Sequence, residues 1–197
     1  MWLHEFGHAI SAWLCGAFAL PLPWFTIGGA SRSIWFIVLE LGGLAYVLNR
    51  WRARAWPAAI VLVLLLVGLL LPAGVMEQFI VFSGDGGALI LGTLLMLSVF
   101  LPDEARLSRG GLRWGFLVIG ASAWSVTFTQ WFSAWRDPAE IPFGKQEGGA
   151  LSDATRLVDH YLWSEAGLIR GYLALSVLCL VALVALAAAI LRARRAH

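Results

Sequence analysis

Long apolar runs, separated by short polar connectors, divide the chain. A helix of about 20 apolar residues spans the roughly 30 Å of a bilayer core, so charge-free runs of this length predict membrane-crossing helices. Such runs occur at 33–49, 57–75, 86–101, 114–135 and 171–191, and only the first is interrupted by a charge, Glu40. Residues 1–20 are also apolar and predict a further helix that crosses the bilayer only in part. The pattern therefore predicts an all-α fold, a polytopic transmembrane helical bundle with about five full spans and a separate N-terminal helix.

The connectors predict which parts lie outside the bilayer core. Residues 50–54, 103–113 and the tail 192–195 are short and basic, and short basic loops prefer the cytoplasmic side. The connector 136–166 is longer and polar, and alternation puts it on the outer side as an extramembrane loop. Within it, Ser152 can cap a short amphipathic helix lying along the membrane surface. The apolar face of this helix would carry Ala154, Leu157, Val158, Tyr161 and Leu162.

The composition agrees with a membrane protein. Of the 197 residues, 60% are hydrophobic and 13% are charged, and the mean hydropathy is +0.79, which is more apolar than a soluble fold accommodates. The net charge of +2 is small and the basic residues lie in separate clusters, which excludes a nucleic-acid-binding face. Cys15 and Cys179 lack C-x-x-C spacing, so we expect two buried small side chains. We predict that residues 1–197 form a single membrane domain in contact with the lipid bilayer.

The chain opens with the pattern H-E-x-x-H, at His4-Glu5-Phe6-Gly7-His8. Residues four apart project from the same face of a helix, so His4 and His8 can turn imidazole nitrogens toward one ion. Glu5 stands beside the ion, where it can take a proton from a zinc-activated water and later pass it to a leaving amine. Two histidines leave room for a third ligand and a water, as in catalytic rather than structural zinc sites.

Chance is the competing interpretation of this motif. The composition alone gives the pattern about once in a few hundred chains. Ionisable groups inside an apolar run are costly and usually face a functional interior. Three of them within five residues therefore favour a metal site over packing.

One stretch offers the third ligand. Ser83-Gly84-Asp85-Gly86-Gly87 stands before an apolar run, so we expect Asp85 at the start of a helix with flexible glycines around it. Taken alone, an Asp-Gly pair is typical of a turn or an N-cap. Its occurrence with H-E-x-x-H in one apolar chain favours a ligand.

Three further ionisable residues are possible auxiliary residues of the metal site. Glu40 is the only charge in its run, and a functional group and an interhelical hydrogen-bonding group are equally good interpretations. Glu77 is a reserve third ligand, although a solvated carboxylate at the interface is the better interpretation. His160 lies on the polar face of the predicted surface helix and could fold over a site, but a solvated histidine is favoured.

The motifs resemble a known family. The run HEFGHAISAWLCG, followed by Trp24-Phe25-Thr26-Ile27-Gly28-Gly29, resembles the site-2 protease family of intramembrane zinc metallopeptidases, whose motif helix precedes a membrane-associated hairpin ending in F-[ST]-x-G. The stretch GDGGALIL resembles the family's second motif, L-D-G-G. The resemblance implies Zn²⁺ held by His4, His8 and Asp85, Glu5 as general base, a membrane-embedded protein or peptide as substrate, and a bacterial inner membrane as location.

The chain departs from the family in two places. Family members carry about 20 apolar residues before the histidines, whereas three residues precede His4, so the first span is absent or the true start lies upstream. Residues 79–83 replace the usual N-P-x-P. Two topologies stay open: a half-span over 1–20 that returns through Pro21-Leu22-Pro23, or an inverted arrangement with the basic loops outside. Two competing functions also stay open, a non-catalytic scaffold or sensor, and a small proton or metal-ion transporter.

Overall fold

The computed structural model describes residues 1–50, 56–101, 111–144 and 151–195. The chain divides into two compact units, Met1–Gly84 and Asp85–His197, and each is described by itself. The basic connectors at 50–54 and 103–113 and part of the loop at 136–166 lie largely outside the described residues, whereas the basic tail 192–195 forms the end of the last helix.

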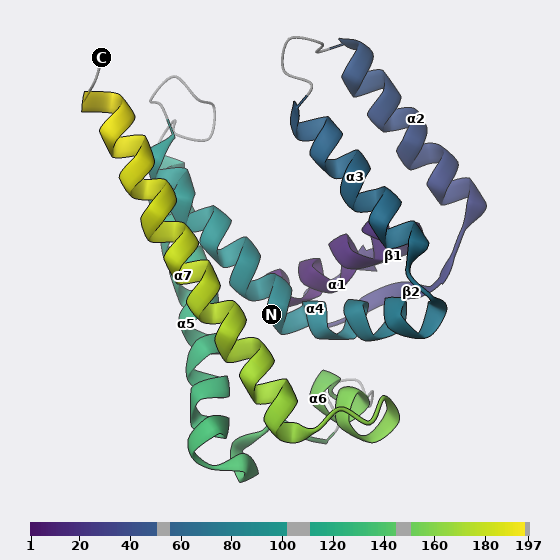
Figure 1. The fold of residues 1–197 in the computed structure, drawn as a ribbon, viewed down its shortest axis with the longest axis vertical. Helices are drawn as coiled ribbons and strands as arrows, with labels where there is room; N and C mark the ends of the chain where they lie inside the picture. The colour runs from purple at the N-terminus through teal and green to yellow at the C-terminus, as the bar shows by residue number, and fades with distance from the viewer. Residues whose placement is uncertain (51–55, 102–110, 145–150, 196–197) are drawn as a thin grey trace. The chain divides into compact units, whose positions relative to one another are not determined.

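The first unit packs a β-hairpin on the N-terminal helix (Figure 1). Its elements are α1 (Trp2–Leu14), β1 (Ala17–Pro21), β2 (Thr26–Arg32), α2 (Ile34–Arg50), α3 (Trp56–Leu70) and the first half of α4 (Ala73–Leu97). The hairpin is antiparallel and pairs Pro21 with Thr26 and Ala19 with Gly28. The core between helix and hairpin consists of Ala9, Ala12, Ala17 and Ala19. These small side chains allow the strand backbone to approach α1 closely, and Trp13 fixes the approach by donating its indole N–H to the Ala19 carbonyl at 2.8 Å.

Arg32 joins the hairpin to two helix ends. Its guanidinium donates to the carbonyls of Cys15 at 3.2 Å, Gly68 at 3.1 Å and Leu71 at 2.6 Å, which satisfies acceptors that the ends of α1 and α3 leave open. Burial raises the pKa of the Cys15 thiol, and the Arg32 charge opposes this shift. The thiol therefore stays protonated at neutral pH, in agreement with the expected buried, inert cysteine.

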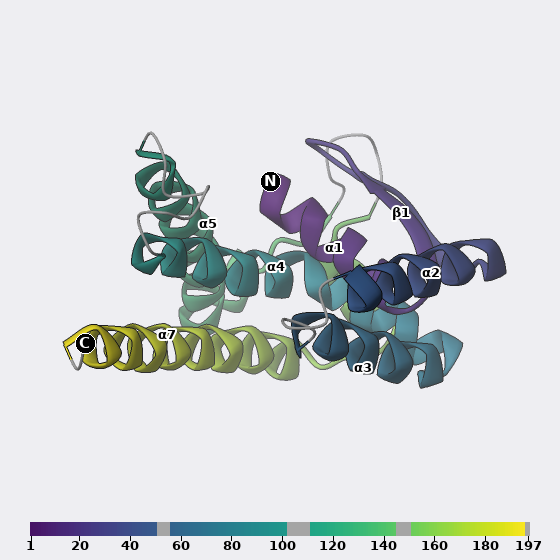
Figure 2. The ribbon, with the colours of Figure 1, turned by 90° about the horizontal axis from the view of Figure 1, so that it is seen from above.

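Helices α2 and α3 form an apolar pair in the first unit, and they lie side by side in both views (Figure 1, Figure 2). Many of their large hydrophobic side chains are exposed, among them Trp35, Leu39, Val63 and Leu70. Two glycines of α2, Gly42 and Gly43, have open space where a side chain would stand.

The second unit is built on three helices. After α4 come η2 (Ser98–Phe100), α5 (Leu112–Arg136), η4 (Pro138–Glu140), α6 (Asp153–Thr155), the π-helical turn η5 (Arg156–His160) and α7 (Glu165–Arg195). Helix α7 packs along α5 (Figure 1), and Trp131, Tyr172, Leu168 and Leu157 fill the core. Helices α4 and α5 touch at Gly92 and Gly120, because a Cβ on either glycine would run into the backbone carbonyl of the other.

The predicted bundle of about five spans is wrong. Within the described ranges, two helices are long and apolar enough to cross a membrane, Ala73–Phe100 and Glu165–Ala193. Helices α2 and α3 have 17 and 15 residues, and α5 is long enough but contains Ser, Thr, Gln and Trp, which lower its hydropathy. The absence of charge, on which the prediction relied, does not measure hydropathy or helix length.

The all-α class is also wrong, because residues 17–32 form the β-hairpin. The predicted N-terminal helix ends at Leu14, and the chain then reverses. Gly16, directly after the C-cap residue, adopts a positive φ of 73°, the left-handed conformation in which many helices end. Gly28 and Gly29 in the second strand also have positive φ angles, of 97° and 88°, which lie outside the helical region.

The predicted surface helix forms only in part. Ser152 caps it as expected, since its hydroxyl accepts from the Thr155 N–H at 3.2 Å. Ala154 and Leu157 are buried as the apolar face predicts, but Leu162 is exposed and has a φ of 59°. The helix ends at His160, so Leu162 lies beyond the last turn and the helical periodicity no longer places it.

Candidate metal centre

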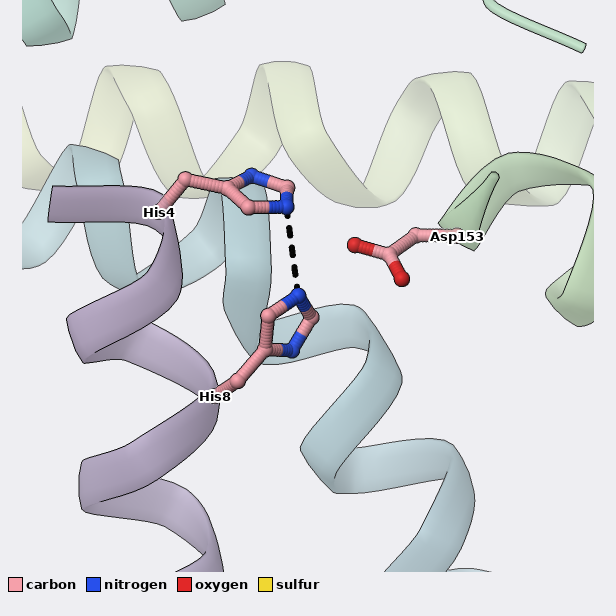
Figure 3. Close-up of side chains that lie close together, drawn as sticks. All are labelled: His4, His8 and Asp153. Carbon is pink, nitrogen blue, oxygen red and sulfur yellow. Dashed lines mark hydrogen bonds between the residues drawn. The ribbon is translucent and has the colours of Figure 1, made fainter. Parts of the chain in front are cut away.

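His4 and His8 form the centre of the candidate site on α1. Their Nε2 atoms are 3.1 Å apart, and the two rings meet edge to face with centroids 4.7 Å apart (Figure 3). Two nitrogens bound to one tetrahedral zinc at about 2.0–2.1 Å stand about 3.3 Å apart. The pair therefore already has the spacing of two ligands of one zinc ion. Figure 3 also draws Asp153, which begins α6 and belongs to the second unit.

A backbone carbonyl sets the tautomer of His8. Its Nδ1 lies 2.8 Å from the carbonyl oxygen of Ile80 on α4, and since a carbonyl can only accept, Nδ1 carries the proton. The neutral ring then has its lone pair on Nε2, the atom that faces His4. A backbone acceptor on the remote ring nitrogen is the usual support of a metal-binding histidine, because it fixes both the tautomer and the ring orientation.

Gly84 provides the surface against which both rings rest. A Cβ built at this position would lie 2.6 Å from the Cε1 atoms of His4 and His8 and 2.6 Å from Nε2 of His8. Only a residue without a side chain allows the α4 backbone to approach the imidazoles this closely. The sequence interpretation treated this glycine as a source of flexibility near a helix start; in the structure it lies inside the continuous helix α4.

Glu5 is buried and held by the hairpin. Its side chain is 3% exposed, and its Oε2 accepts a hydrogen bond of 2.7 Å from the hydroxyl of Thr26 at the start of β2. A donor on one carboxylate oxygen fixes the orientation of the group. Thr26 was not predicted to have a functional role. Its position in the F-[ST]-x-G pattern was the feature of the sequence that could have indicated one.

Asp85 follows Gly84 directly in α4 and is described with the second unit. Its Oδ2 accepts a hydrogen bond of 2.8 Å from the indole N–H of Trp131 on α5. The expectation that Asp85 stands at the start of a helix is wrong, because α4 begins at Ala73. Residues 73–82, which precede the glycine-rich stretch, belong to the same helix.

The three auxiliary residues do not join the histidine pair. Among the described residues, the group of metal-ligating side chains that contains His4 and His8 includes none of Glu40, Glu77 and the predicted third ligand Asp85. Glu40 lies partly buried in α2, where its Oε2 has no hydrogen-bond partner among the residues that the structure describes. His160 is exposed at the end of η5 and stacks edge to face on Tyr161, as expected for a solvated histidine.

The arrangement suits hydrolysis. The first unit supplies two imidazole nitrogens at ligand spacing and a buried carboxylate one residue from the first histidine, which are the groups needed to hold a Lewis acid and move a proton beside it. Comparisons of the chain with protein-family models, curated proteins and solved structures find no match.

Proposed function

We propose that the chain is a zinc metallopeptidase of the site-2 protease type that hydrolyses peptide bonds of membrane-embedded polypeptides. The observation that carries the proposal is the histidine pair: the Nε2 atoms stand 3.1 Å apart while Ile80 holds the Nδ1 proton of His8. The 3.1 Å contact is itself a hydrogen bond, in which Nε2–H of His4 donates to the lone pair of His8 Nε2. A zinc ion would take the place of this proton and bind both nitrogens.

In this proposal Asp85 completes the protein ligands. Gly84 rests against both imidazoles, and Asp85 is the next residue of the same unbroken helix. A carboxylate has about four acceptor positions, so the hydrogen bond from Trp131 to Oδ2 is compatible with a ligand bond from Oδ1. Two histidines and one carboxylate would hold the metal and leave room for a water beside it.

In the proposed reaction Glu5 transfers the proton, and the metal supplies positive charge. Glu5, buried and oriented by Thr26, takes a proton from the attacking water and delivers it to the amine of the leaving peptide. The buried surroundings exclude bulk water and strengthen the interactions of this carboxylate with developing charge. Zinc, when bound, supplies the positive charge that polarises the scissile carbonyl and acidifies the water.

We propose an integral membrane location, in a bacterial inner membrane. Among the described residues, two helices are long and apolar enough to cross a bilayer, and many apolar side chains of α7 are exposed, including Val177, Leu178, Val181 and Val184. The exposed apolar side chains of α2 and α3 suit the same environment, because large exposed apolar surfaces mark protein or membrane contacts.

Removal of the metal tests the proposal directly. The purified full-length chain is expected to bind one zinc per chain and to cleave a reporter with a single membrane-spanning segment in liposomes. Because the ligand histidines have no catalytic power without the metal, a zinc chelator such as 1,10-phenanthroline is expected to stop cleavage, and added Zn²⁺ is expected to restore it. Zinc binding without any cleavage would favour a scaffold or sensor, and ion flux that survives chelation would favour a transporter.

The hydroxyl of Thr26 is expected to contribute through Glu5. Thr26→Val keeps the shape but removes the donor to Oε2, and loss of a supporting hydrogen bond at such a site lowers activity by about 10- to 100-fold. Thr26→Ser keeps the hydroxyl and is expected to stay within a few-fold of wild type. Reporter cleavage rates measured at equal zinc content check both; equal loss in Val and Ser variants would contradict the role of the hydroxyl.

A further inference from the structure

The carboxylate of Asp85 has a buried donor in the second unit. Trp131 of α5 is 1% exposed, and its indole N–H lies 2.8 Å from Asp85 Oδ2. The indole nitrogen is a donor only, so the direction of this hydrogen bond is unambiguous. A tryptophan N–H buried at such depth normally needs an acceptor, and the acceptor here is the residue assigned above as the third ligand.

Trp131 is itself held in place. Its ring stacks on Tyr172 of α7, with centroids 4.3 Å apart and an angle of 26° between the planes. Tyr172 is also 1% exposed, and one turn further along α7 Ser176 is fully buried. The N–H of Trp131 therefore has one orientation, set by the packing of α5 against α7.

We propose that Trp131 is a positioning residue for the zinc ligand Asp85, an inference that rests on the proposed function. The indole N–H fixes Oδ2 and with it the plane of the carboxylate, which presents Oδ1 as a monodentate ligand. A neutral donor suits this task, because it orients the carboxylate without cancelling the charge that attracts the metal. An arginine at the same place would orient the group and also compete with the ion for it.

The test compares one substitution at two tryptophans of α5. Trp131→Phe keeps an aromatic ring against Tyr172 and removes the N–H. Trp124→Phe is the matched control, because the indole N–H of Trp124 is buried and has no hydrogen-bond partner among the described residues. Zinc affinity of the purified full-length chain is measured by competition with a chromophoric chelator, and the ligand field is measured from the visible absorption of the Co²⁺-loaded protein.

We expect Trp131→Phe to weaken zinc binding by about 10- to 100-fold and to shift the Co²⁺ spectrum. We expect Trp124→Phe to stay within about twofold of wild type, because no hydrogen bond is lost. If Trp131→Phe does not fold, Trp131→β-(3-benzothienyl)alanine, which replaces the N–H by sulfur in a ring of the same shape, is expected to give the same loss.

Two results would overturn the inference, and they are distinguishable. Unchanged zinc affinity and Co²⁺ spectrum in the Trp131 variant, together with strong loss in Asp85→Asn, would remove the role of Trp131 and leave the proposed ligands intact. Unchanged affinity in both Trp131→Phe and Asp85→Asn, together with loss in His4→Asn, would remove Asp85 from the ligand set and the inference with it.

Discussion

Replacement of Glu5 by glutamine is expected to abolish peptide cleavage and leave zinc bound. Glutamine keeps the size of the side chain and can still accept the hydrogen bond from Thr26 through its amide oxygen, but it cannot take a proton from water. Loss of a general base lowers the rate by about 10²- to 10⁴-fold. The ligand atoms of His4 and His8 lie on other side chains, so the zinc content is expected to stay at the wild-type value.

The measurement is cleavage of a membrane-embedded reporter in liposomes, with zinc determined on the same preparation. Glu140→Gln is a suitable control, because Glu140 is exposed in η4 and its substitution removes the same charge at a residue that is not part of the H-E-x-x-H motif. Cleavage by Glu5→Gln at the rate of Glu140→Gln would exclude Glu5 as the base. Loss of zinc together with activity would instead assign Glu5 a structural role at the site.

The sequence predicted the placement of His4 and His8 on one helix face, but the fold class that it predicted is wrong. A spacing of four residues on a helix is enough to place His4 and His8 on one face, and the structure brings their Nε2 atoms together. What spacing could not predict is the set of partners from distant parts of the chain. The Ile80 carbonyl is 72 residues from His8, and Thr26 is 21 residues from Glu5. Such contacts depend on how the elements pack, which periodicity does not encode.

The error in the number of membrane spans has a simple physical origin. The prediction counted charges, and the absence of charge does not distinguish a long apolar helix from two shorter helices or from a helix rich in Ser and Thr. A separate error placed Asp85 at a helix start because glycines surrounded it, although helix α4 runs through Gly84, Gly86 and Gly87 without a break. Glycine is tolerated inside a helix at a cost of about 1 kcal/mol relative to alanine, and close packing against another group can offset that cost.

Gly84→Ala is expected to damage the metal site. The new Cβ would stand 2.6 Å from three ring atoms of His4 and His8, whereas ordinary carbon contacts are about 3.5–4.0 Å. The rings must therefore shift by about 1 Å, which breaks the Nε2 spacing of 3.1 Å and strains the hydrogen bond to Ile80. We expect zinc affinity to fall by about 10- to 100-fold.

Gly74→Ala, in the same helix, is a matched control for which the expected change in folding stability has the opposite sign. Gly74 has open space around it, so Gly74→Ala adds the same methyl group without a clash and should raise stability slightly through helix propensity, by at most about 1 kcal/mol. Gly84→Ala is expected to lower stability by about 1–3 kcal/mol through overpacking, even with zinc removed by EDTA. Denaturant unfolding and chelator competition on the two variants measure both effects. Equal stability and equal zinc affinity in the two variants would show that the imidazoles do not rest on α4 at Gly84.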